Sequence, residues 1–363
     1  MIKHKDHFHG SDLEKIEKIY GIKKEDIVSF SANVNPLGVA PSVKEALSNN
    51  IDAITSYPDR EYTSLRNAMA SYCGCSADNI VVGNGSTELI SLFIKAVNPT
   101  KALILGPTYS EYEHEISLNN GTTKYYPLKE ELDFNLDVTD FINSLNDSID
   151  LLVICNPNNP TSTSITNKDM RKILDACLVN DITVLVDETY VEFTEDIKAI
   201  TSVSLTAAYD NIVVLRGTSK FFASPGLRLG YAVCGSADLL KAVKSKQDPW
   251  AINSLAVIAG IAMFSDKEYQ RAAHDLIISE RNRMYDLFEK SSRFKPYKPT
   301  GNFMLLQILD DNITSQDLFD ECIKKRMMIR DCSTFPFLNE KYIRFCFMNP
   351  EDNDKLAAIL LGE

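Results

Sequence analysis

The chain has 363 residues, of which 44% are apolar and 24% are charged, and it carries a formal net charge of −12. This length and composition predict a globular protein of about two domains and exclude a disordered or fibrous chain. The acidic charge argues against nucleic acid or an anionic membrane surface as a partner. The longest apolar stretch, at 256–264, is too short to span a bilayer, and the first six residues lack the apolar core of a secretory signal. We therefore expect a cytoplasmic protein.

Short apolar runs alternate with helical patterns through the middle of the chain. The runs are rich in Val, Ile and Leu, which is typical of strands buried on both faces, and they cover 102–106, 150–155, 183–186, 211–215 and 229–234. Amphipathic helical patterns accompany them, for example at 89–96 and 167–180. This alternation predicts a mostly parallel α/β sheet, in which ligands collect at the carboxyl ends of the strands.

The pattern changes after Trp250. Long helices are predicted at 254–264 and 266–290, and they are followed by a strand, a helix and a strand at 302–308, 315–325 and 342–347. This order predicts a smaller α+β domain. We expect an N-terminal arm and segment, 1–47, that packs with this small domain, a large domain over 48–255, and the small domain over 256–363.

Eight cysteines are scattered through apolar segments, and no pair has C-x-x-C spacing. A set of reduced thiols is therefore favoured over a disulfide framework, and no metal site is predicted. His4, His7 and His9 cluster near the N-terminus. The cluster is compatible with weak metal binding, but a solvated arm is the usual explanation.

The most informative segment is Thr218–Gly230, which directly follows a buried strand. A lysine such as Lys220 is costly to bury at a strand end unless it is paired or its pKa falls, and a lysine with a lowered pKa is suited to forming a Schiff base. Ser219 adds a hydroxyl, and Arg228 adds a forked cation suited to phosphate. The alternative is a surface lysine beside a loop arginine.

Two other strand ends carry polar side chains. Asp187 ends the run 183–186, and a carboxylate there needs a cationic partner; Tyr190 follows three residues later. Asn159 lies in Asn156-Pro157-Asn158-Asn159-Pro160, whose prolines make a rigid turn that presents its amide to a ligand. Each feature alone is also compatible with an ordinary exposed turn.

A glycine-containing loop, Gly83-Asn84-Gly85-Ser86-Thr87-Glu88, precedes the helical pattern at 89–96. Small residues at a helix start expose backbone N–H groups that suit phosphate. Glu88 replaces the third glycine of the dinucleotide pattern G-x-G-x-x-G, and the phosphate loop G-x-x-x-x-G-K-[ST] is absent. These absences weaken the case for an NAD-dependent oxidoreductase or a nucleotide hydrolase.

The order of these features resembles the fold-type I pyridoxal-phosphate enzymes of the class I/II aminotransferase superfamily, over about residues 30–347. The resemblance implies a large domain with a mostly parallel seven-stranded sheet between helices, a smaller α+β domain, and pyridoxal 5′-phosphate as cofactor. It implies that Lys220 forms the Schiff base with the cofactor, that Asp187 keeps the pyridine nitrogen protonated, and that Tyr190 and Asn159 hydrogen-bond the ring oxygen.

The same resemblance assigns further cofactor and substrate contacts. Tyr109 would stack on the ring, and Arg344 would bind the α-carboxylate of the substrate. Tyr57 would reach the cofactor phosphate of a neighbouring subunit, which implies a homodimer. The cofactor phosphate would be held by residues from three segments, Gly85, Ser86, Thr87, Ser219 and Arg228.

A closer resemblance is to threonine-phosphate decarboxylases of cobalamin synthesis, which are related to histidinol-phosphate aminotransferases. It rests on His9-Gly10, 30–38, 248–253 and 329–332. It implies that His9, Asn35 and Arg330 lie near the phosphate of a small phosphorylated substrate. The alternatives are a salt bridge for Arg330 and a disordered arm for His9.

The resemblance favours a decarboxylase of O-phospho-L-threonine or O-phosphoserine. An aminotransferase of the histidinol-phosphate type is the main alternative, and a non-catalytic cofactor-binding protein is a third. Two positions depart from the superfamily pattern: Gly217 replaces a frequent Ser or Thr, and Ser162 replaces a usual glycine. The first predicts a weaker hold on the cofactor phosphate, and the second makes the geometry of the Asn-Pro turn uncertain.

Overall fold

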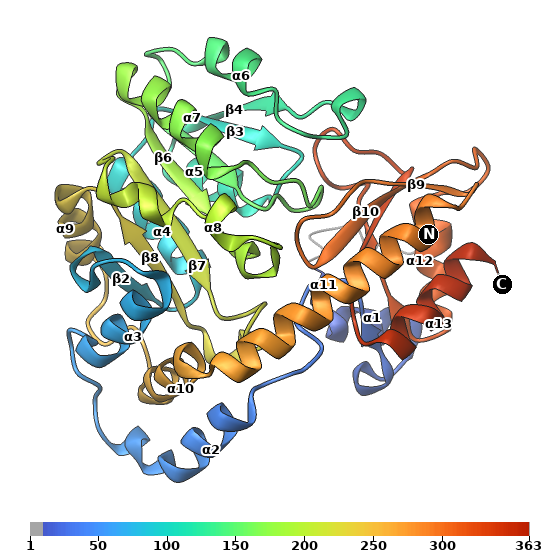
Figure 1. Cartoon of the computed structure of the whole chain (residues 1–363), viewed down its shortest axis with the longest axis horizontal. Coiled ribbons are helices and arrows are strands. Elements are labelled where there is room, and N and C mark those ends of the chain that lie inside the picture. The colour runs from blue at the N-terminus through green and yellow to red at the C-terminus, as the bar shows by residue number, and fades with distance from the viewer. Residues whose placement is uncertain (1–9, 363) are drawn as a thin grey trace.

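A computed structural model describes residues 10–362 and places a seven-stranded sheet in the larger part of the molecule (Figure 1). The strand order is β2-β8-β7-β6-β5-β3-β4, and β8 alone runs antiparallel to its neighbours in this sheet. The strands are β2 (Ile80–Gly83), β3 (Lys101–Gly106), β4 (Thr122–Pro127), β5 (Leu151–Cys155), β6 (Thr183–Asp187), β7 (Ile212–Gly217) and β8 (Gly230–Cys234). The mostly parallel α/β sheet expected from the sequence is confirmed.

All five predicted strands are present. The sequence pattern did not predict the two edge strands of the sheet, β2 and β4. Of these, β4 is the more polar. Its sequence, TTKYYP, is polar and its side chains are only partly buried, because β4 lies at the sheet edge. A strand at an edge needs no continuous apolar run.

Two layers of helices cover the sheet, which explains why its central strands are apolar on both faces. In β5, Leu152 and Ile154 belong to one core and Leu151 and Val153 to the other. One face packs against α4 (Ser86–Val97), α5 (Glu111–Leu118) and α9 (Ala237–Lys246). The other packs against α3 (Thr63–Cys73), α6 (Val138–Ser144), α7 (Asn167–Val179) and α10 (Ser254–Ser265), with α8 (Ile197–Ile200) beside α7.

A second, antiparallel sheet has the order β12-β13-β10-β9. Its strands are β9 (Phe294–Pro296), β10 (Phe303–Ile308), β12 (Arg330–Asp331) and β13 (Tyr342–Cys346). The long helix α11 (Lys267–Glu289) leads to it from α10, and it is accompanied by α12 (Ser315–Lys324) and α13 (Pro350–Leu361) (Figure 1). No helix among residues 10–362 combines the length and apolarity needed to cross a bilayer.

The N-terminal segment contacts both parts of the molecule. Beyond α1 (Leu13–Tyr20), β1 (Val28–Ser29) pairs in parallel with β11 (Met327–Met328), next to the small sheet. The following helix, α2 (Pro41–Asn49), packs against α10, which also packs against α3. The domain limits at residues 47 and 255 stay a prediction, and they place α10 across the second limit.

Candidate active site

Lys220 lies three residues after the end of β7, in a partly buried position. Its Nζ donates a hydrogen bond to the carbonyl of Ala32, at 2.6 Å. Burial, reinforced by the positive charge of Arg344, lowers the pKa of Lys220 to about 8. A larger fraction of this amine is therefore unprotonated near neutral pH than for an ordinary lysine, as a nucleophilic lysine requires.

Asp187 ends β6, the strand next to β7, and is only 4% exposed. Its Oδ1 accepts hydrogen bonds from the backbone N–H of Thr189 (2.9 Å) and from the Thr189 hydroxyl (2.6 Å). Its Oδ2 accepts a bond from the Tyr112 hydroxyl, at 2.7 Å. These three donors fix the carboxylate at the strand end and offset part of the cost of burying it.

Arg344, on β13, reaches from the small sheet into this site. It donates to Oδ1 of Asn159 and, at 2.7 Å, to the carbonyl of Ser31. Its buried Nε has no hydrogen-bond partner among the described residues, and the guanidinium lies 5.3 Å from the ring centre of Phe303. Tyr190 packs against the same Phe303 ring. Asn159 and Tyr190, both predicted as site residues, are therefore in the immediate surroundings of Arg344.

Arg330 and Arg344 face each other as directly paired residues of β12 and β13. Paired residues of an antiparallel ladder project to the same side of the sheet, and like charges there repel each other. Both side chains are buried, at 9% and 4% exposure. Burial and the charge of Arg344 lower the pKa of Arg330 to about 10. Arg330 also donates to the Thr334 hydroxyl at 3.1 Å and lies over the Phe335 ring.

The loop that precedes α4 forms a close-packed cradle with Arg228. Gly85 has a φ of 84°, and a Cβ at this position would lie 2.5 Å from Nη2 of Arg228. A Cβ at Gly230 would lie 2.6 Å from the backbone nitrogen of Ser86. Glycine is therefore required at both positions, and the guanidinium lies at the N-terminus of α4, where backbone N–H groups and the helix dipole favour an anion.

The departures at Gly217 and Ser162 are accommodated. A Cβ at Gly217 would lie 3.7 Å from the Ser86 hydroxyl, so the position borders the cradle, where it supplies no hydroxyl. Ser162 adopts the left-handed conformation at φ 59°, and its hydroxyl accepts a hydrogen bond from the backbone of Gly301, at 2.9 Å. That serine therefore ties the Asn-Pro turn to the segment that leads into β10.

Two predicted residues, Asn35 and Tyr57, do not project into this constellation, and a third, His9, lies outside the described residues. The Asn35 amide donates to the carbonyl of Phe221 (2.8 Å) and to the Tyr269 hydroxyl (3.0 Å), so it stabilises the chain around Lys220. Tyr57 is 79% exposed, and its ring centre lies 4.8 Å from that of Trp250. The proposed roles of these residues toward phosphate groups stay predictions.

Sequence reasoning did not assign roles to Tyr112 or to the 31–33 segment. Tyr112 is the second residue of α5, and its ring meets that of Tyr109 edge to face, with 5.6 Å between the ring centres. Asn33 donates to the Tyr190 hydroxyl at 3.3 Å, and the two residues before it accept bonds from Arg344 and Lys220. A role for Tyr112 could have been inferred from its position three residues after Tyr109, which was already assigned to the site.

The comparisons with known proteins agree with this geometry. The model of the family "Aminotransferase class I and II" matches residues 25–360. The chain belongs to this family. Its cofactor is pyridoxal 5′-phosphate.

Relatives of similar identity carry two different activities in their names. The threonine-phosphate decarboxylase of Salmonella typhimurium is 32% identical, over 97% of this chain and 95% of its own. The histidinol-phosphate aminotransferase of Methanococcoides burtonii is also 32% identical, over 96% and 93%. The crystal structure of the histidinol-phosphate aminotransferase from Clostridium acetobutylicum superposes with a TM-score of 0.85 at 30% identity, covering 92% and 98%.

The residues present fit the family cofactor. The cradle of Gly85 and Arg228 suits its phosphate, the Asp187 carboxylate suits a protonated ring nitrogen, and the Lys220 amine suits its aldehyde. Tyr109 lies close enough to Asp187 and Tyr190 for their charges to raise its pKa, after the larger effects of burial and of Glu111. These groups lie in the loops that follow, or at the carboxyl ends of, four strands of the large sheet: β2, β3, β6 and β7.

Proposed function

We propose that this enzyme decarboxylates O-phospho-L-threonine, or O-phosphoserine, to the corresponding phosphorylated amino alcohol, as in the synthesis of the cobalamin side chain. The observation that carries the proposal is the buried, directly paired Arg330 and Arg344. Arg344 has a buried Nε without a hydrogen-bond partner among residues 10–362, and Arg330 places a second guanidinium directly opposite it, so the pair suits a ligand with two anionic groups. A phosphorylated α-amino acid carries both in one small molecule.

The two arginines have separate tasks in this proposal. Arg344 donates a hydrogen bond to Asn159 and is close enough to Lys220 for its charge to lower the lysine pKa. It therefore binds the α-carboxylate, the anionic group nearest to the reacting carbon. Arg330 lies one strand further away, so it binds the phosphate. Gripping both ends of the substrate fixes its rotation about the central bonds, and this rotation decides which bond to the α-carbon is aligned for cleavage.

The remaining chemistry is divided between the cofactor and the protein. Pyridoxal phosphate supplies an electron-withdrawing ring that stabilises negative charge on the α-carbon of the substrate. Asp187, held by Tyr112 and Thr189, provides the negative charge that favours protonation of a ring nitrogen. The Lys220 amine, with its pKa lowered to about 8, is able to accept a proton and to return it to the α-carbon.

An aminotransferase of the histidinol-phosphate type is the second candidate, and the relatives of 30% and 32% identity with that name favour it. Such an enzyme would use Arg330 for the phosphate of one substrate and Arg344 for the carboxylate of the other. Histidinol phosphate has no carboxylate, so it would leave Arg344 without an anionic partner in that half of the reaction.

Carboxyl-labelled phosphothreonine, supplied to the enzyme without any 2-oxo acid, separates the two candidates. The decarboxylase releases labelled CO₂ over many turnovers and forms a phosphorylated amine. Absence of CO₂, together with glutamate formation from 2-oxoglutarate when histidinol phosphate is supplied, would establish the aminotransferase instead.

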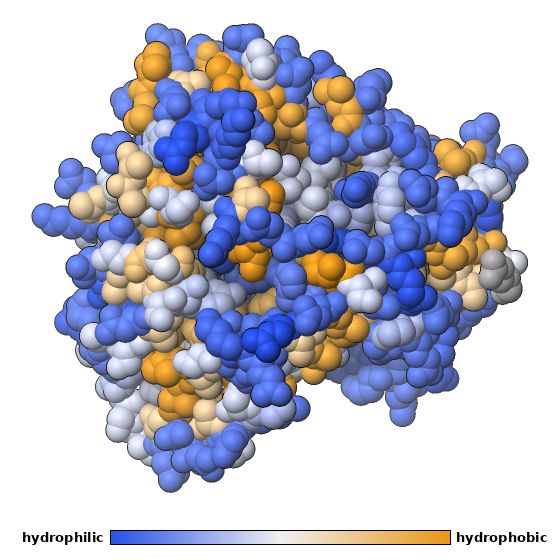
Figure 2. Space-filling view, viewed as in Figure 1, coloured by the Kyte–Doolittle hydropathy of each residue, from blue (hydrophilic) through white to orange (hydrophobic). Residues whose placement is uncertain are grey.

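We also propose that the enzyme acts as a homodimer in the cytoplasm. The large apolar side chains of Ile51, Ile54, Tyr57 and Trp250 are exposed, at 40% to 79%. The nearby helix α10 is apolar around most of its surface, and Figure 2 shows apolar residues in its region. Contiguous apolar surface of this kind marks an association face. The eight cysteines are free thiols, which supports a reducing compartment.

A further inference from the structure

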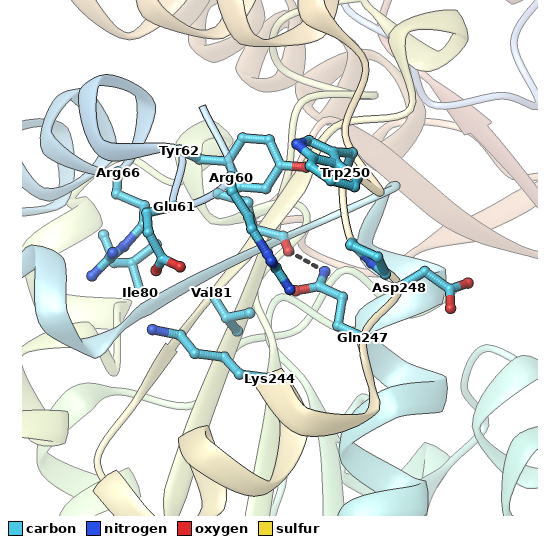
Figure 3. Close-up of a pocket in the computed structure, with 12 residues that line it drawn as sticks. Arg60, Glu61, Tyr62, Arg66, Ile80, Val81, Lys244, Gln247, Asp248 and Trp250 are labelled. Carbon is cyan, nitrogen blue, oxygen red and sulfur yellow. Dashed lines mark hydrogen bonds between the residues drawn. The ribbon is translucent and has the colours of Figure 1, made fainter. Parts of the chain in front are cut away.

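A second cavity lies outside the site described above, on the segment that also carries Tyr57. It is lined by the start of α3, by β2, by the end of α9 and by the loop that follows α9 (Figure 3). Its volume is about 190 Å³, which is below the range of about 300–1,000 Å³ that drug-sized ligands occupy. A ligand here is therefore an ion or a very small molecule.

Three cationic side chains line this cavity: Arg60, Arg66 and Lys244. Arg66 is committed to the protein, because it donates twice to the carbonyl of Ala77 and pairs with Asp78 at 3.6 Å. Among residues 10–362, neither Arg60 nor Lys244 forms an ion pair. Burial, followed by the charge of Arg66, lowers the pKa of Lys244. The cavity therefore holds positive charge that the protein itself does not neutralise.

The lining carboxylates do not balance these cations. Glu61 faces the side of Arg66 and Lys244 and raises the Lys244 pKa by less than Arg66 lowers it. Asp248 points away from the other lining groups (Figure 3). Three cations thus face two carboxylates, Glu61 and Asp78, and Asp78 is the one that pairs with Arg66. At the back of the cavity the Gln247 amide donates to the carbonyl of Val82, at 2.6 Å, which fixes the loop against β2.

Trp250 holds Arg60 in place. The guanidinium carbon lies 5.6 Å from the centre of the indole ring, in a cation–π contact. The backbone of Trp250 has a φ of 57°, a left-handed conformation that a bulky side chain adopts only when its surroundings enforce it. Neighbouring contacts do so, since the backbone N–H of Ile252 donates to the Tyr62 hydroxyl at 3.1 Å.

We propose that this cavity binds a compact oxyanion of the phosphate type, as the free ion or as a small phosphate ester. Arg60 and Lys244 are its principal ligands, and Arg66 supplies additional positive charge. Guanidinium and ammonium groups are the preferred protein donors to phosphate oxygens. The site is separate from the arginine pair of the small sheet and from the cradle at Gly85.

The chain offers an internal reporter for this proposal, because Trp250 is its single tryptophan. Inorganic phosphate is titrated into the holoenzyme at constant ionic strength, with chloride as the replaced anion, and the fluorescence of Trp250 is recorded. We expect a saturable change. In the double variant Arg60→Gln, Lys244→Gln the apparent Kd rises at least about tenfold, since each charge-assisted contact is lost.

Two controls locate the binding. Lys241→Gln removes a charge from the same helix at a position that does not line the cavity, and its Kd stays within about twofold of that of the parent. Arg330→Ala removes the proposed substrate-phosphate contact and leaves the fluorescence response intact. The proposal is overturned if the parent shows no saturable response, if the double variant responds like the parent, or if Arg330→Ala abolishes the response. None of these readouts needs turnover, so the outcome is independent of the proposed reaction.

Discussion

The two halves of the active site differ in how far the protein satisfies its own charged groups. At the large sheet, Asp187 receives three hydrogen bonds and Lys220 donates to a carbonyl, so these groups are oriented before any ligand arrives. At the small sheet, Arg330 and Arg344 are buried opposite each other, and the buried Nε of Arg344 has no hydrogen-bond partner among residues 10–362. This difference fits the proposed division of roles, in which the first half holds the cofactor and the second receives an anionic substrate.

The sharpest test of the large-sheet half is Lys220→Ala. Removing the amine eliminates both the attachment point for the cofactor aldehyde and the proton carrier, so we expect activity to fall by at least about 10²- to 10⁴-fold. Borohydride reduction followed by peptide mass mapping should find the cofactor on residue 220 in the parent and not in the variant. A modified peptide elsewhere in the parent would contradict this assignment.

The lowered pKa of Lys220 predicts a pH dependence. Below about pH 8 the amine of the cofactor-free protein is protonated and unreactive, and above it the neutral amine predominates. The rate of acylation of Lys220 should therefore fall about fiftyfold from pH 8 to pH 6, and the decrease approaches tenfold per pH unit well below pH 8. Mass mapping as a function of pH measures this rate. A midpoint at the ordinary lysine value of 10.5 would exclude the proposed effect of burial and Arg344.

Arg330→Ala tests the small-sheet half. We expect the Kd for phosphothreonine to rise roughly 10- to 100-fold, because a desolvated charge-assisted contact is lost. The Kd for unphosphorylated threonine should change little, and calorimetry on both ligands measures the difference. Equal weakening of both ligands would remove Arg330 from the phosphate site.

The smallest expected effect belongs to Tyr112→Phe. This variant removes one of three hydrogen bonds to Asp187 and keeps the buried ring, so we expect cofactor affinity to fall by about three- to tenfold. The pH at which the absorption of the bound cofactor changes should also shift, which a purely structural role in the core would not produce. An unchanged spectrum with a lower melting temperature would assign Tyr112 to packing alone.

The large-sheet half was largely predictable from the sequence, because its residues directly follow buried strands, which are recognisable as short runs of Val, Ile and Leu. Lys220, Asp187 and Asn159 all lie at such strand ends, and the parallel topology brings them to one edge. Tyr112 was not predicted, because a tyrosine on an amphipathic helix has the same pattern whether it donates to a carboxylate or fills a core.

The small-sheet half was less predictable. β12 has two residues, too few to show any periodicity, so its register with β13 is not visible in the sequence. Asn35 donates hydrogen bonds to Phe221 and Tyr269, which lie more than 180 positions away in the sequence, so these bonds could not be predicted from the local pattern. The edge strand β4 was not predicted, because a strand that is partly buried on one face alone has no continuous run of apolar residues in its sequence.

A crystal structure of Lys220→Ala with phosphothreonine bound would show whether the two arginines hold opposite ends of one ligand. We expect one ligand molecule that spans the arginine pair, with its carboxylate on Arg344 and its phosphate on Arg330. A ligand whose phosphate lies elsewhere, with Arg330 still bonded only to protein groups, would contradict this expectation.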